Sequence, residues 1–136
     1  LKNIDSPQLK LRICKGIYRE PPEIAFQTKE EIRNNFITLV QTLLNGRGTA
    51  QIATHDPIII DSLENWIEEN KIPPNRFEFQ VLYGVPMGRK LEQLRDKGWT
   101  VRIYVPFGNQ WFDYSVRRLK ENPKIIGYVL GNLFKR

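Results

Sequence analysis

Two adjacent arginines near the end of the chain could bind a small anion. The stretch YSVRRLKEN places Arg117 beside Arg118, and paired guanidiniums can hold a carboxylate or a phosphate through bidentate hydrogen bonds. Neighbours on a helix point about 100° apart, so spacing alone leaves open that one arginine is simply solvated. Tyr114 and Glu121 have the spacing that brings them to the same helical face. This combination fits a small anionic substrate with an apolar body.

Other residue types that could take part in chemistry occur at the ends of apolar runs. His55, in ATHD, is the only histidine, and it could shuttle a proton, contact a cofactor or serve as a hydrogen-bonded structural residue. Gly16, after Lys15, permits close approach of a ligand, although no glycine-rich phosphate-binding motif is present. Tyr83 and Tyr104 fit core packing nearly as well as a ligand wall. No nucleophile–base triad or acid pair stands out.

Alternating strand and helix patterns should position these residues. We expect strands over 9–18, 49–54, 77–83 and 101–105, and helices over 28–46, from Asp56-Pro57 onward, 88–97 and 110–122, followed by a mixed segment over 125–134. This alternation predicts an α/β fold with a parallel sheet, whose carboxyl-terminal strand ends meet at one edge. A closed (β/α)8 barrel needs eight such units and about 250 residues. The chain is therefore expected to form a small open sheet or half of a barrel.

Composition places the chain among ordinary globular proteins. It has 136 residues, a net charge of +6 and a single cysteine, Cys14, which excludes a disulfide framework and suits a reducing compartment. The basic residues are scattered, which favours a solvated basic surface over a nucleic-acid footprint. No apolar run is long enough for a transmembrane helix. The chain starts at Leu1, with neither an initiator methionine nor a signal or transit peptide, so we expect it to begin partway through a longer protein.

A series of motifs resembles the proline dehydrogenase family, in particular its monofunctional bacterial members. The motifs are LRICKGIYREP, AFQTKEEIRNNF, AQIATHD, FEFQVLYGVP, VRIYVPFG and YSVRRLKEN, in family order over nearly the whole chain. The resemblance implies that residues 1–136 form the C-terminal half of a distorted (β/α)8 TIM barrel, with strands five to eight and the helix after strand eight. It implies FAD-dependent oxidation of L-proline to Δ1-pyrroline-5-carboxylate by hydride transfer, with electrons then passing to a quinone.

The resemblance also assigns roles to individual residues. Arg117 and Arg118 would hold the proline carboxylate, Leu82, Tyr104 and Tyr114 would surround its ring, and Tyr104 would exclude a 4-hydroxyl group. Arg12 would lie near the flavin N5, where a positive charge stabilises the reduced ring. The remaining residues expected at the cofactor are Lys15, Gly16, Tyr18, Lys29, Thr54, His55 and Glu121.

The active-site lysine, aspartate and glutamine that the family carries on its first four strands are missing from this sequence. We therefore expect a fragment, or one part of a split enzyme, that needs an N-terminal half-barrel on the same or a separate chain. The expected location is the cytoplasm, with peripheral association with the inner membrane left open. Two other classes stay open: a half-barrel enzyme that binds a phosphorylated substrate, and a non-enzymatic basic binding module.

Overall fold

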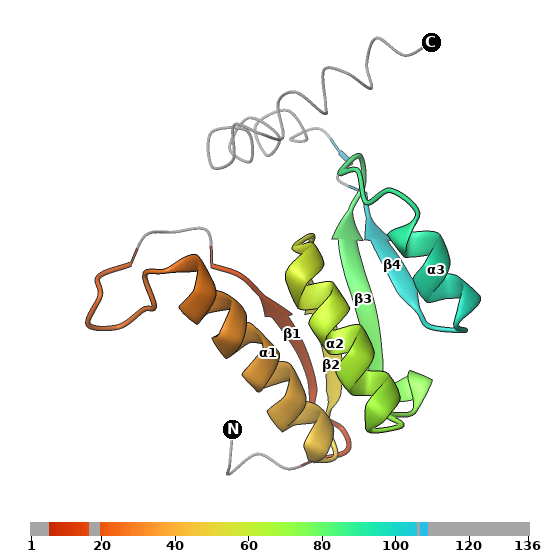
Figure 1. Ribbon diagram of the computed structural model, residues 1–136, viewed down its shortest axis with the longest axis horizontal. Coiled ribbons are helices and arrows are strands. Elements are labelled where there is room, and N and C mark those ends of the chain that lie inside the picture. The colour runs from red at the N-terminus through yellow and green to blue at the C-terminus, as the bar shows by residue number, and fades with distance from the viewer. Residues whose placement is uncertain (1–5, 17–19, 106, 109–136) are drawn as a thin grey trace, which may run out of the picture.

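The computed structural model describes residues 6–16, 20–105 and 107–108 (Figure 1). Strands and helices alternate along this part of the chain, as the sequence predicts. The elements are β1 (Lys10–Cys14), α1 (Lys29–Asn45), β2 (Thr49–Ala53), α2 (Pro57–Glu69), a 3-10 turn (Pro74–Arg76), β3 (Phe77–Leu82), α3 (Lys90–Asp96) and β4 (Val101–Tyr104). The helix predicted over 110–122 and the mixed segment over 125–134 lie outside the described residues. None of the described helices combines the length and apolar character needed to cross a membrane.

The starts of the two long helices follow from local capping chemistry. The Thr28 hydroxyl accepts a hydrogen bond from the Glu31 N–H, and the Glu31 carboxylate accepts one from the Thr28 N–H, which completes a capping box. At α2, the Asp56 carboxylate accepts from the Ile58 N–H at 3.1 Å, and Pro57 occupies the first helical position. Both helix starts therefore lie where the sequence predicts them.

The four strands form one parallel sheet in the order β1-β2-β3-β4. In β1 the ladder ends at the pair Cys14↔Ala53, because β2 also ends there. The predicted strand 9–18 is therefore too long: Lys15 and Gly16 have left the sheet. The predicted helix 88–97 likewise starts too early, because Gly88 has a positive φ of 55° that helical geometry does not allow. Strands β2, β3 and β4 each end one residue before their predicted limits.

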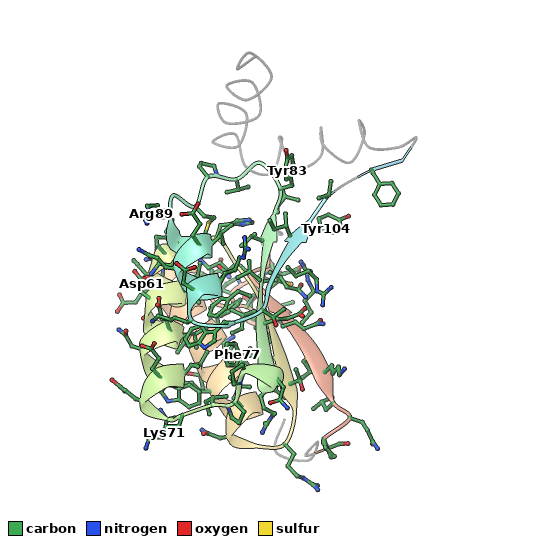
Figure 2. The ribbon with its side chains drawn as sticks, turned by 90° about the vertical axis from the view of Figure 1, so that its right-hand side faces the viewer. Asp61, Lys71, Phe77, Tyr83, Arg89 and Tyr104 are labelled. Carbon is green, nitrogen blue, oxygen red and sulfur yellow. The ribbon has the colours of Figure 1, made fainter. Side chains whose placement is uncertain are left out.

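All three α-helices lie on the same side of the sheet (Figure 2). The core fills the space between the two layers, and its strand residues alternate along each strand, as in Phe77, Phe79 and Val81 of β3. The opposite face carries no helix from the described residues. We call it the open face; it is formed by Lys10, Arg12, Cys14, Thr49, Gln51, Ala53, Glu78, Gln80, Leu82, Arg102 and Tyr104.

Candidate active site

The carboxyl ends of β2 and β3 are joined by the single histidine. His55 Nε2 accepts a hydrogen bond from the Leu82 backbone N–H at 2.8 Å, so Nε2 is unprotonated and the ring proton sits on Nδ1. Burial lowers the pKa of His55 below its ordinary value. The buried Thr54 precedes it, and its hydroxyl accepts from the Asp56 N–H at 3.1 Å. A neutral His55 is therefore fixed at the strand edge, with its Nδ1–H available as a donor.

Asp56, the residue after His55, forms ion pairs with two basic side chains. Its Oδ2 accepts from Arg33 Nε at 2.8 Å and forms an ion pair with Lys15 Nζ. The Asp56 side chain is only 9% exposed, so burial by itself would raise its pKa. Hydrogen bonds from Arg33 and Lys15 nevertheless hold the pKa of Asp56 below its usual value. The carboxylate thus ties the end of β1 and helix α1 to the start of α2.

On the open face, hydrogen bonds connect β1, β3 and β4. Arg12 Nε donates to Gln80 Oε1 at 2.8 Å, and Gln80 Nε2 donates to Glu78 Oε1 at 2.5 Å. Glu78 also accepts two hydrogen bonds from Arg102, both at 2.9 Å. Arg102 holds the pKa of Glu78 below its ordinary value, so this carboxylate is ionised at neutral pH. The open face is therefore a polar surface with an organised set of charges.

A protein-family comparison matches residues 8–129 to the model described as "Proline dehydrogenase". The chain belongs to the proline dehydrogenase family. It is 38% identical to Proline dehydrogenase 1 of Bacillus subtilis subsp. natto over 137 aligned positions, and 33% identical to Proline dehydrogenase of Deinococcus radiodurans over 133. These alignments cover 100% and 98% of this chain but only 45% and 43% of the relatives. The chain thus spans less than half the length of the curated relatives it matches.

The structure brings together several residues that the proline dehydrogenase resemblance singles out. His55 is bonded to the backbone of Leu82, and Lys15 is paired with Asp56, the residue after His55. Leu82 lies in register with Tyr104 at the same edge of the sheet, where Figure 2 shows Tyr104 near Tyr83. Gly16 lies one residue beyond Lys15, and a Cβ added to it would meet nothing within 4 Å.

Other predicted site residues are not tested in this way. Lys29 is exposed in the first turn of α1, and none of the described hydrogen bonds or ion pairs joins it to the residues above. The roles of five further residues stay predictions because these residues lie outside the described part of the chain: Tyr18, Tyr114, Arg117, Arg118 and Glu121.

The sequence patterns did not indicate that Gln80 has partners on its own strand and on β1. Glu78 and Arg102 occupy alternate positions in FEFQVL and VRIY, strands that a fully covered parallel sheet would make apolar on both faces. That alternation was the available signal for a polar face. Arg33 carried no comparable signal, because one charged residue on a surface helix is the ordinary pattern.

Proposed function

We propose that residues 1–136 are the C-terminal half of a distorted (β/α)8 barrel that oxidises L-proline to Δ1-pyrroline-5-carboxylate. The half would supply strands five to eight and the helix after strand eight, and an N-terminal half-barrel would supply the rest. Electrons would leave through FAD to a quinone, in the cytoplasm or at the periphery of the inner membrane. Membership of the proline dehydrogenase family is the observation that carries this proposal.

The open face supports the half-barrel part of the proposal. Parallel sheets are almost always covered on both faces, yet all three described helices cover the same face here (Figure 2). The outer strands β1 and β4 have no further strand beside them among the described residues. Four more parallel strands would cover the second face by closing the sheet on itself. Residues such as Arg12 and Gln80 would then point into the barrel interior.

The residues at the strand edge have the donor chemistry that a flavin nucleotide requires. The His55 Nδ1–H is free of the bond to Leu82, and only the Nε of Arg12 is bound to Gln80. The open space at Gly16 would admit a ligand close to the backbone. The residues proposed to hold FAD are Arg12, Lys15, Gly16, Tyr18, Lys29, Thr54, His55 and Glu121. Bound FAD would supply the hydride acceptor, because no amino-acid side chain can take up a hydride reversibly.

The protein would contribute position and charge to the substrate. Arg117 and Arg118 would hold the carboxylate of proline, and Tyr114 would cover its ring from the same helix. Leu82 and Tyr104, which are in register at the ends of β3 and β4, would form the adjoining wall. A tyrosine at position 104 would leave no room for a 4-hydroxyl group, which favours proline over hydroxyproline. No strong protein base is required if the substrate amine reacts in its neutral form.

The test uses a completed protein, in which this chain replaces the matching 45% of Proline dehydrogenase 1 from B. subtilis subsp. natto. The purified protein is mixed with L-proline without oxygen, and the visible absorbance of the flavin is followed. We expect proline to bleach the flavin of the wild-type protein, and not that of Arg117→Met at the same proline concentration. The control is Arg95→Met, which changes an exposed arginine of α3 and should leave the bleaching intact. A flavin that proline does not bleach would refute the proposed function.

A further inference from the structure

The hydrogen-bond chain on the open face has a direction. Arg102 has only donors and binds Glu78 through two of them, and Glu78 as a carboxylate has only acceptors. The amide of Gln80 must therefore turn its NH2 group toward Glu78, which leaves Oε1 facing β1. Arg12 Nε donates to that oxygen at 2.8 Å. The charge pair between β3 and β4 thus determines which end of the Gln80 amide meets Arg12.

The hydrogen bond to Gln80 restrains the Arg12 side chain, which would otherwise be free to move. Arg12 lies on the edge strand β1 and is exposed, and its long stem has many rotamers in solution. To reach Gln80 it must cross β2, where the small Ala53 stands in register with Gln80. Binding at Nε leaves the four N–H groups of the two terminal nitrogens for another partner. The guanidinium is thereby held above the middle of the sheet.

The location of Gln80 outside the hydrophobic core distinguishes it from a purely structural glutamine. Its side chain lies on the open face and not in the core between the sheet and the helices. The core residues of β3, which are Phe77, Phe79 and Val81, point the other way. Replacing Gln80 should therefore change the position of Arg12 more than it changes the stability of the fold.

We propose that Gln80 is a positioning residue, which holds the Arg12 guanidinium beside the redox-active ring of the flavin while the Glu78–Arg102 pair holds the Gln80 amide. The inference rests on the proposed function, because it takes Arg12 to be the cation next to the flavin. A fixed positive charge stabilises the negative charge that the ring gains on reduction, and a cation that swings into solvent stabilises it less. Gln80 would thus set the flavin potential through Arg12.

The test measures the midpoint potential of the flavin at pH 7 in the completed protein. Gln80→Met preserves side-chain length but replaces the amide oxygen that accepts from Arg12 with a thioether sulfur, which is only a weak acceptor. We expect the equilibrium constant for flavin reduction in this variant to fall about tenfold, which for a two-electron couple is a shift of about 30 mV to more negative potential. Gln80→Asn is one methylene shorter and should shift the potential in the same direction. Gln51→Met is the matched control, since Gln51 is a neutral neighbour on the same face and in register with Arg12.

A double-mutant cycle decides whether the effect passes through Arg12. We expect Arg12→Met to lower the potential at least as far, and Arg12→Met with Gln80→Met to lower it no further. The inference would be overturned if the shifts of Arg12→Met and Gln80→Met added in the double variant. It would also be overturned if both Gln80 variants had the same midpoint potential as Gln51→Met. If Gln80→Met does not retain flavin, the Gln80→Asn result decides by the same criterion. A wild-type flavin that proline does not reduce would refute the proposed function instead, and would remove the premise of this inference with it.

Discussion

Asp56 has two roles that mutations can separate. It accepts the N-cap hydrogen bond of α2 from Ile58, and it pairs with both Lys15 and Arg33. Asparagine is as good an N-cap residue as aspartate but carries no charge. Asp56→Asn therefore removes only the ion pairs, whereas Asp56→Ala removes the ion pairs and the cap.

The expected magnitudes follow from the exposure of the three side chains. Removing one partner of a fully buried pair costs about 3–5 kcal/mol, while an exposed pair contributes about 0–1 kcal/mol. The Asp56 side chain is 9% exposed, but those of Lys15 and Arg33 are 32% and 29% exposed and can regain water. We therefore expect Asp56→Asn to lower the free energy of unfolding by about 1–3 kcal/mol. Asp56→Ala should lower it by about 1 kcal/mol more, the usual cost of losing a cap.

Urea unfolding of the 136-residue chain, followed by tryptophan fluorescence at several pH values, measures both effects. The folded-state pKa of Asp56 is lowered, so the ion pairs stabilise the fold above the ordinary pKa of 3.8 and lose this effect as pH falls through the folded value. The difference between wild type and Asp56→Asn should therefore be full at pH 7 and vanish in acid. An Asp56→Asn protein as stable as wild type at pH 7 would refute the reasoning.

Three further outcomes follow from other contacts. Arg76 donates to the carbonyl of Leu44 in the last turn of α1 and to those of Gly46 and Gly48 after it, so Arg76→Ala should lower the free energy of unfolding in urea by about 2 kcal/mol. Arg76→Lys should recover only part of this loss, and a full recovery would show that charge alone suffices. Gly48→Ala should lower the free energy of unfolding by about 1–3 kcal/mol, because its Cβ would collide with the buried Leu43. Gly16→Ala should leave the free energy of unfolding nearly unchanged, and equal stabilities of the two variants would contradict this reasoning. Burial lowers the pKa of His55, so wild-type stability should decline as pH falls below about 6.5, a slope that His55→Gln should lack.

Much of the fold could be predicted because local signals determine it. The Thr28–Glu31 capping box and the Asp56-Pro57 pair specify where α1 and α2 begin, and both predictions are confirmed. The parallel sheet follows from the alternation of strands and helices. Strand ends were predicted less accurately, because a strand ends where it loses its last pairing partner on a neighbouring strand. The residues near Lys15 give no indication that β2 ends at Ala53, which is what ends the pairing of β1.

The site was only partly predictable because its contacts join residues that are distant in sequence. Sequence placed His55 at a strand end but left its role open, and only the folded chain brings the Leu82 N–H to it. The bond between Arg12 and Gln80 spans 68 positions and depends on strand register, which single-sequence patterns do not provide. Residue type and spacing indicated that Arg117 and Arg118 could bind an anion, but the identification of that anion as the proline carboxylate comes from the family resemblance alone.

The central claim, that the open face becomes the interior of a flavin-holding barrel, can be tested on the single cysteine of this chain. Cys14 lies on the open face at the end of β1 and is exposed. The measurement is its alkylation rate, located by mass spectrometry, in the 136-residue chain and in the completed protein. We predict modification at least about tenfold slower in the completed protein, because barrel closure would remove the thiolate from solvent. Equal rates in the two proteins would contradict the barrel and the site proposed within it.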